Sequence, residues 1–321
     1  MEIKIIRYNA AHKKLWNNFV TKHEFPFLFY RDFIEYHGDK FEDHSLLLFI
    51  KEKLAVIFPA HQYKDSIYSH NGLSFGGFLP DAALGNASIF NLYKNLLFYY
   101  KQAGFSYCFY KKMPLFYTKK LAQHDDFFLF KSNASLESRE MNLVIPLQNQ
   151  PKLQARKYRS LKKSENAQLK VLESYSWEAF WQILTYNLRQ RHAVSPVHSI
   201  TEIQKLANVF PKNIRLFVVM KAGEIIAGTV LFINQQVIHC QYIAATEKGR
   251  NLGALDFLFY YLINNFNQFP YFSLGVSSLR KNNQVNSGLI EWKEGFGALP
   301  FSHDFYKIDF TNLHFPNQVF T

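Results

Sequence analysis

The sequence predicts an α/β (α+β) fold with two tandem, related modules, each a mixed, mostly antiparallel sheet flanked by helices. The chain has 321 residues, enough for two domains at roughly 100–200 residues each. It is 48% hydrophobic and holds 33 Phe and 19 Tyr, a composition that excludes a disordered chain. The same order of elements also occurs twice, about 170 residues apart, which indicates a duplicated module.

The first half contains a hairpin, an amphipathic helix and a further strand. Apolar residues 45–51 and 54–59 are expected as two antiparallel strands joined by a tight turn. Within residues 89–100, apolar side chains recur at three- and four-residue spacing, which predicts a helix packed on the sheet. Residues 105–110 form the strand that follows.

The second half repeats this order. Residues 215–221 and 225–233 form the hairpin, and residues 237–244 add another apolar strand. The amphipathic helix is expected at 255–266, followed by a strand at 271–274. The two halves therefore correspond element by element.

The boundary between the modules is expected near residues 148–152, a polar run that contains a proline. We assign residues 1–150 to the first module and 151–321 to the second. The first module is expected to be degenerate, because its loop at 76–86 carries Asp81 and a carboxylate repels a phosphate. The second module is the expected donor or cofactor binder.

Composition also limits the function classes. The net charge is +12 and the pI is about 9.4, which favours anionic partners such as phosphorylated cofactors, nucleic acid or an acidic membrane face. Cys108 and Cys240 lie in apolar runs, as reduced core thiols do, rather than in a disulfide or zinc pattern. No apolar run suits a signal peptide or a transmembrane segment, so we expect a cytoplasmic protein whose membrane contact, if any, is peripheral.

An anion-binding loop is expected directly after the strand at 237–244. Glycines let the backbone approach an anion, and the free N–H groups and dipole of the following helix attract it. Two cations add formal charge. The residues assigned to this cofactor-binding loop are Lys248, Gly249, Arg250, Asn251, Gly253 and Ala254. The alternative is an ordinary strand-to-helix connection with surface charges.

At this loop the chain resembles the GNAT acyltransferases, and more closely the FemAB-like branch, in which two GNAT modules occur in tandem. The GNAT motif is Arg or Gln, two residues, Gly, one residue, then Gly or Ala. Arg250 and Gly253 match its first two fixed positions, whereas Leu255 stands at the third, with Ala254 one residue early. The resemblance implies transfer of an acyl or aminoacyl group to an amine. It implies acetyl-CoA, another acyl-CoA or an aminoacyl-tRNA as donor, with no metal, and a small molecule or a cell-envelope precursor as acceptor.

Three further segments resemble FemAB-like chains: a basic helix at 156–165, a late segment at 286–297 and, more weakly, a loop at 69–77. The resemblance implies that Lys293 handles the donor ester by stabilising negative charge on the carbonyl or leaving group. An ion pair with a neighbouring glutamate is the alternative for this lysine. Contacts with acceptor or tRNA phosphates are expected on the basic helix, where a solvated face is the alternative. The substrate-binding residues expected from these segments are Arg156, Arg159, His70 and Asn286.

Residues 187–198 concentrate arginine and histidine in a segment expected as a loop, after a helix that begins near Trp177. Arg191 and His198 are candidate substrate-binding residues, since Arg can grip an anion with two hydrogen bonds. His192 is a candidate catalytic residue, because a histidine near its unperturbed pKa can accept the proton of an attacking amine, a role that His198 or a water could also fill. Ordinary surface and capping roles are the alternative, and no zinc motif is present.

Residues 72–76 match the Gly-x-Ser-x-Gly pattern of a hydrolase, but the flanking residues lack the strand and helix that a nucleophile elbow needs. Two other functions stay open. One is a plain acetyl-CoA-dependent N-acetyltransferase. The other is a catalytically silent protein that binds a phosphorylated ligand or RNA.

Overall fold

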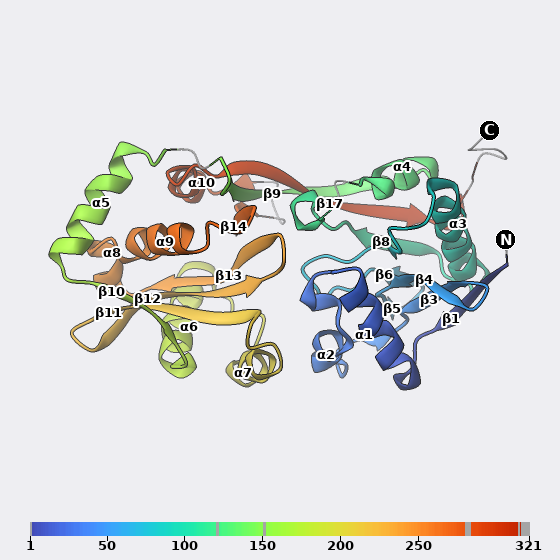
Figure 1. Cartoon of the computed structure of the whole chain (residues 1–321), viewed down its shortest axis with the longest axis horizontal. Helices are drawn as coiled ribbons and strands as arrows, with labels where there is room; N and C mark the ends of the chain where they lie inside the picture. The colour runs from blue at the N-terminus through green and yellow to red at the C-terminus, as the bar shows by residue number, and fades with distance from the viewer. Residues whose placement is uncertain (1, 120–121, 150–151, 280–283, 314, 316–321) are drawn as a thin grey trace. The chain divides into compact units, whose positions relative to one another are not determined.

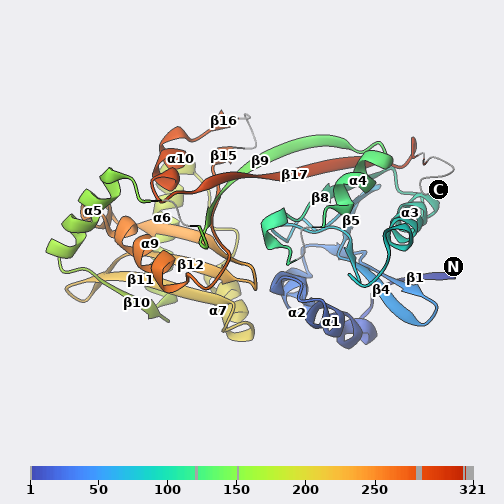
Figure 2. The same ribbon diagram turned by 45° about the horizontal axis from the view of Figure 1, so that its top comes forward.

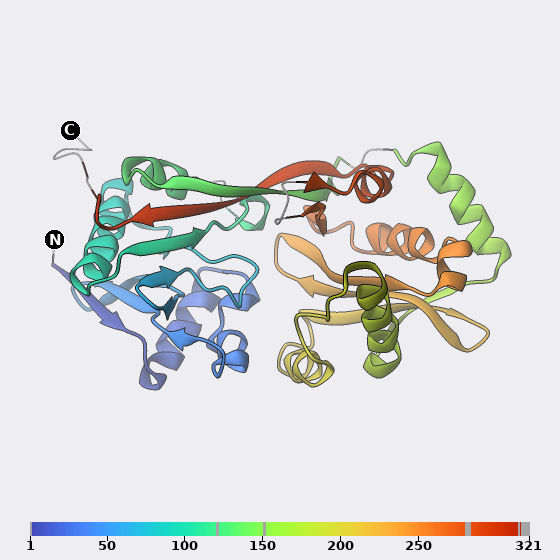
Figure 3. The same cartoon turned by 180° about the vertical axis from the view of Figure 1, so that it is seen from behind.

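The computed structural model describes residues 2–119, 122–149, 152–279, 284–313 and 315, without the side chains of Arg191, His192, Ser278 and Leu279. The chain divides into two compact units. The first consists of Met1–Glu140 with Ser302–Thr321, and the second of Met141–Phe301. Figures 1 and 3 follow the chain from its blue N-terminal end to its red C-terminal end.

The first unit contains two groups of strands. One is an antiparallel sheet in the order β1-β3-β4-β7, and the other runs β17-β8-β6-β5-β2, with β6 and β8 parallel. The bounds are β1 Ile3–Arg7, β2 Glu42–Asp43, β3 Leu46–Ile50, β4 Lys53–Phe58, β5 His61–Tyr63, β6 Ser66–Tyr68, β7 Leu79–Pro80, β8 Tyr107–Lys111 and β17 Leu299–Asp309. The helices are α1 Lys13–Lys22, α2 Arg31–Ile34, α3 Asn86–Gln102 and α4 His124–Lys131, with short 3-10 turns at 10–12, 27–29, 35–37 and 115–117.

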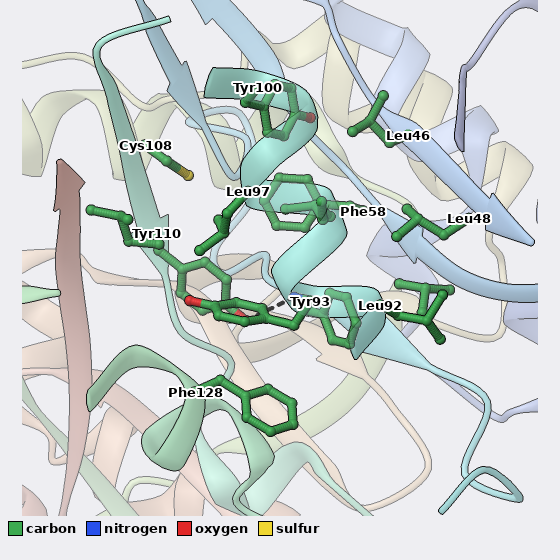
Figure 4. Close-up of a cluster of buried hydrophobic side chains, with 14 of the residues drawn as sticks. Leu46, Leu48, Phe58, Leu92, Tyr93, Leu97, Tyr100, Cys108, Tyr110 and Phe128 are labelled. Atoms are coloured by element: carbon green, nitrogen blue, oxygen red, sulfur yellow. Dashed lines mark hydrogen bonds between the residues drawn. The ribbon is translucent and has the colours of Figure 1, made fainter. Parts of the chain in front are cut away.

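Helix α3 supplies much of the core of the first unit (Figure 4). Its apolar face includes Leu92, Leu96 and Leu97, which are at most 1% exposed. Two tyrosines extend the same face. The hydroxyl of Tyr93 hydrogen-bonds with Ser132, and that of Tyr100 donates to the His44 carbonyl at 2.9 Å. The burial of this face accounts for the three- and four-residue spacing in the sequence.

The second unit is built on a sheet in the order β10-β11-β12-β13-β14-β9. All neighbours are antiparallel except β13 and β14, which are parallel. The bounds are β9 Ser135–Pro146, β10 Lys170–Ser174, β11 Ile214–Lys221, β12 Glu224–Ile233, β13 Val237–Ala245 and β14 Tyr271–Val276, with a separate small hairpin of β15 Ser278–Leu279 and β16 Gln284–Val285.

Six helices of the described residues surround this sheet. They are α5 Ala155–Asn166, α6 Trp177–His192, α7 Ile200–Val209, α8 Glu247–Asn251, α9 Ala254–Asn265 and α10 Ser287–Glu294. Figure 2 shows α5, α9 and α10 close to one another beside this sheet. The buried side chains of α9 fill the core, with Leu258, Phe259 and Leu262 fully buried.

The predicted duplication is confirmed in its main elements. Both hairpins, both amphipathic helices and the strands that follow them lie within a few residues of the expected ranges. Both cysteines are buried and unpaired with each other. In the described part of the chain, no helix has the length and hydrophobicity that a bilayer span requires.

Three details differ from the sequence prediction. The expected loop after β13 contains the short helix α8, because Thr246 caps a helical turn there. Residues 187–192 belong to α6 instead of a loop, since helix-forming Leu188, Arg189 and Gln190 continue it. The chain beyond residue 301 belongs to the first unit, because β17 pairs with β8 from Phe305–Lys111 to Asp309–Tyr107.

Candidate functional site

The parallel strands β13 and β14 pair over only three positions. The register runs from Val237 opposite Tyr271 to His239 opposite Ser273. Beyond that point β13 continues through residues 240–245 with β12 as its partner, while β14 pairs on its other side with β9. The two strands therefore separate in the middle of the sheet.

The Lys293 ammonium lies at this separation. The side chain comes from α10, and the residue is 2% exposed. Its Nζ donates to the carbonyl oxygens of Gly275, at 2.8 Å, and Val276, at 2.9 Å, where β14 ends. An ammonium has three N–H donors, and the third has no protein partner among the described residues. A buried cation therefore has one donor left for a ligand.

The surroundings of this ammonium bring the pKa of Lys293 close to neutral pH. Burial lowers the pKa of Lys293 to about 8. The neighbouring His239 shares a hydrogen bond of 3.0 Å between its Nδ1 and the Ser273 hydroxyl. Burial, followed by the Lys293 charge, lowers the pKa of His239 to about 4, so this imidazole is neutral. Near pH 7 the site therefore holds one positive charge in apolar surroundings, where electrostatic interactions are strong.

Helix α10 is fixed in place from both ends. At its N-terminus, the Asn286 side chain accepts a hydrogen bond from the Leu289 N–H at 3.0 Å. Near its C-terminus, the Trp292 indole donates to Asp256 at 2.8 Å. The same Asp256 oxygen accepts from Lys157 of α5 at 2.7 Å. These contacts position the helix that carries Lys293, and they give Asn286, expected to bind substrate, a capping role.

Lys157 is buried within the basic helix. Its side chain is 3% exposed, and its Nζ lies 3.8 Å from the centre of the Phe296 ring. Burial lowers the pKa of Lys157 to about 8, although Asp256 acts in the opposite direction. The expected substrate contacts on α5 lie beside it. Arg156 donates to the Glu291 carbonyl, and Arg159 is exposed.

The expected anion-binding loop is folded as two helical pieces. The Thr246 hydroxyl caps α8 by accepting from the Gly249 N–H at 3.0 Å. Lys248 pairs with Glu224 at 2.6 Å, and Arg250 donates to the Ala245 carbonyl at 2.7 Å. Both cations of the loop therefore already have protein partners. Asn251 is exposed, and Ala254 is buried at the start of α9.

Gly253 joins the two helical pieces and lies against α5. Its φ of +71° is in the left-handed region. A Cβ placed there would lie 2.4 Å from the Ser160 hydroxyl oxygen, and the Ser164 hydroxyl donates to the Leu252 carbonyl at 2.9 Å. Helix α5 therefore covers the N-terminus of α9, where the sequence predicted a bound phosphate.

The remaining predicted residues lie elsewhere. Arg191 and His192 end α6, and their side chains are outside the described residues. His198 is buried, with Nδ1 in a hydrogen bond to the Tyr242 hydroxyl. His70 belongs to the first unit, where its ring lies 5.3 Å from the rings of both His37 and His61.

Comparisons with known proteins agree with this architecture. Residues 154–278 match the family model of the acetyltransferase (GNAT) domain. The crystal structure of FemX superposes with a TM-score of 0.70 at 10% identity, covering 96% of this chain and 97% of FemX. Residues 154–278 thus carry a GNAT domain, and the whole chain has the tandem GNAT fold seen in FemX.

Two other solved structures share this tandem GNAT fold. L-PGS from Bacillus licheniformis gives a TM-score of 0.62 at 12% identity, over 92% of this chain and 91% of that protein. A tandem GNAT protein from the clavulanic acid biosynthesis pathway gives 0.52 at 8% identity, over 96% of this chain and 99% of that one. At such identities the likeness concerns the fold. No curated protein sequence matches the chain.

Four residues that shape the site were not predicted from the sequence: His239, Ser273, Gly275 and Lys157. A polar His and a Ser inside otherwise apolar strands were a usable signal, because a buried polar side chain needs a partner. Among the described residues, no cluster of three potential metal ligands was found.

Proposed function

We propose that the second unit holds an activated acyl or aminoacyl donor where β13 and β14 separate, and that the chain transfers the acyl group to an amine. The observation that carries this proposal is the Lys293 ammonium, which is buried at the separation with one N–H donor unused. A developing oxyanion is the group that such a donor stabilises best.

In this reaction the amine nitrogen attacks the carbonyl carbon of the donor ester or thioester. The carbonyl oxygen gains negative charge, which the Lys293 ammonium stabilises. The C–O or C–S bond to the leaving group then breaks, and the nitrogen loses a proton. Most of the acceleration comes from placing the amine beside a polarised carbonyl. His192 and His198 remain candidate proton acceptors, together with a water molecule.

We propose an aminoacyl-tRNA as the donor, ahead of an acyl-CoA. Helix α5 covers the N-terminus of α9, and Lys248 and Arg250 are engaged with protein groups, which disfavours a tight grip on a pyrophosphate. The exposed cations of α5, among them Arg159, Lys162 and Lys163, suit the phosphates of a nucleic acid.

We further propose a cell-envelope precursor as the acceptor. Two proteins of the same fold support this choice through their names: FemX and the putative lysylphosphatidylglycerol synthetase from Agrobacterium fabrum, the latter with a TM-score of 0.60 at 12% identity. Phosphatidylglycerol is a membrane lipid, so the second name links this fold to an envelope component.

The test is transfer of radiolabel from aminoacyl-tRNA or from acetyl-CoA to a UDP-linked muropeptide and to an amino-phospholipid. The proposal predicts transfer from the charged tRNA, with strong loss in Lys293→Met. Transfer from acetyl-CoA alone would replace the donor assignment with a plain N-acetyltransferase. Absence of transfer from both, with tRNA or phosphorylated ligand still bound, would favour a silent binding protein and overturn the proposal.

A further inference from the structure

The first unit contains a cavity of about 360 Å³. It is lined by the end of α1, the segments around Gly76–Pro80 and Lys112–Lys119, and the start of α4. Aromatic and aliphatic side chains make up most of its wall, including Phe25, Phe78, Leu115 and Tyr117. A mostly apolar cavity with a few polar groups is the usual form of a small-molecule site.

Asp125 of α4 lines this cavity, is half-buried, and has no ion-pair partner among the described residues. Its Oδ2 accepts a hydrogen bond from the Tyr110 hydroxyl, which in turn accepts from the Phe78 N–H at 2.8 Å. No Lys, Arg or His nitrogen of the described residues makes an ion pair with it. Burial raises the pKa of Asp125 to about 6, so the group is ionised at pH 7.5. A carboxylate that is partly removed from water and has no ion-pair partner is costly unless a cation compensates it.

The backbone around this carboxylate is shaped to fit it. Gly77 has a φ of +110°, and a Cβ there would lie 2.7 Å from the Tyr110 hydroxyl oxygen and 3.4 Å from Asp125 Oδ2. The glycine therefore permits the close approach of the chain to the Tyr110–Asp125 pair. This is a second sign that the position of the carboxylate is built into the fold.

His23 supplies an independent sign of a missing partner. Its side chain is 8% exposed and lines the same cavity. Its Nε2 is buried and has no hydrogen-bond partner, and the nearest carboxylate oxygen, on Asp81, lies 3.8 Å away. Burial lowers the pKa of His23, so the ring is neutral. Buried polar atoms normally have a partner, and a ligand in the cavity would provide one.

The lysines that line the cavity do not neutralise Asp125. Lys22 lies 3.5 Å from Asp81, Lys112 pairs with Asp126, and Lys119 pairs with Glu24. Each of the three lysines therefore has an acidic partner other than Asp125, and Lys22 shares Asp81 with Lys53. Within the described part of the chain, Asp125 is thus the carboxylate of the cavity lining that has no ion pair.

We propose that this cavity binds the primary ammonium group of a ligand, which pairs with the Asp125 carboxylate while its apolar body packs against Phe25, Phe78 and Tyr117. The inference deepens the proposed function, on which its choice of ligand rests, because that function names an amine as the class of acceptor. It concerns recognition of the amine and assigns Asp125 no step in the transfer.

The test uses 2-phenylethylamine and its neutral analogue 2-phenylethanol as probes of the full-length protein, by calorimetry and NMR titration at pH 7.5. The amine is expected to bind about tenfold more tightly than the alcohol, since a charge-assisted hydrogen bond forms only with the amine. Asp125→Asn should remove this preference and leave alcohol binding in place. Asp65→Asn, at an exposed position of the same unit outside the cavity lining, is the control and should keep the preference.

A second measurement guards against an Asp125→Asn protein that fails to fold. In the wild type, amine affinity should fall as the pH is lowered from 7.5 to 5, because Asp125, with a pKa of about 6, becomes protonated, while alcohol affinity stays constant. Lys112 and Asp126 face the same carboxylate, so Lys112→Met should shift this profile without abolishing it.

Equal binding of amine and alcohol by the wild type, or a pH-independent preference, would overturn the inference. Both measurements are made without a donor, so the two proposals fail separately. A protein that prefers the amine but transfers no acyl group overturns the proposed function alone, whereas one that transfers acyl groups without this preference overturns the cavity assignment alone.

Discussion

The Lys293 Nζ lies 2.8 Å from the carbonyl oxygen of Gly275, the residue with which β14 turns away from its parallel neighbour. Gly275 has a φ of +73°, a conformation that a residue with a side chain rarely adopts. The turn aims two successive carbonyls at one ammonium. The helix that carries Lys293 is thereby tied to the strand end.

Lys293→Met is expected to lower kcat for acyl transfer by about 100- to 1,000-fold, because the developing oxyanion loses its charged donor. Lys293→Arg should retain part of the rate, since it keeps the charge but not the geometry. Steady-state kinetics with the productive donor measure both. Lys205→Met, on the exposed face of α7, is the control. A Lys293→Met enzyme as fast as the wild type would contradict the proposed role.

Asp256→Asn is expected to destabilise the second unit by about 3 kcal/mol, because it leaves Lys157 buried without a counter-charge. Deprotonation of Lys157 limits the loss, since its pKa is already near 8. Urea denaturation followed by Trp fluorescence measures the change. Glu224→Gln breaks the exposed pair with Lys248 and should cost less than about 1 kcal/mol. Equal losses in the two variants would argue against a buried pair at Asp256.

Acid should destabilise the first unit through its buried histidines. Burial lowers the pKa of His61 to about 4 and that of His70 well below its usual value. The folded state therefore binds fewer protons than the unfolded chain, whose histidines titrate near 6.5. The stabilisation is complete above pH 6.5 and is lost as the pH falls towards 4, by up to about 1.4 kcal/mol per pH unit for each histidine.

Urea titrations of the wild type and His61→Gln between pH 7.5 and 4.5 test this loss. The difference between the two proteins isolates the histidine, because the carboxylates titrate in both. The free energy of unfolding should depend less steeply on pH in the variant. Parallel curves would show that His61 is not the group responsible.

Gly253→Ala is expected to cost about 1–3 kcal/mol, because the new Cβ meets the Ser160 hydroxyl and the left-handed backbone is strained. Gly223→Ala separates the two causes. It has a φ of +82° with nothing within 4 Å of a Cβ, so only the backbone strain applies. Thermal unfolding of both variants should therefore show the larger drop for Gly253→Ala. The reverse order would mean that α5 does not press on Gly253.

The sequence predicted the elements whose pattern is local. A hairpin such as β11–β12 shows two apolar runs and a turn, and α9 shows a helical period, so both could be recognised from neighbouring residues alone. The end of α6 could not, because arginine and histidine are compatible with both a helix and a loop.

Properties that depend on distant partners escaped prediction. Lys157 resembles the other cations of its helix in sequence, and only Asp256, 99 positions away, marks it as buried. The same holds for Lys248, whose pairing with Glu224 depends on how β12 begins. Lys293 was assigned from a family resemblance; its carbonyl partners in β14 follow only from the folded sheet.

The pairing of β17 with β8 also sets an order for folding on the ribosome. The first unit is assembled from two stretches of chain, so its last strand is synthesised only after all 161 residues from Met141 to Phe301. Until then one edge of β8 is exposed in a nascent protein rich in Phe and Tyr. The first unit, although its N-terminal part is translated first, can therefore complete its sheet only at the end of synthesis. Chaperones should be needed most during that interval.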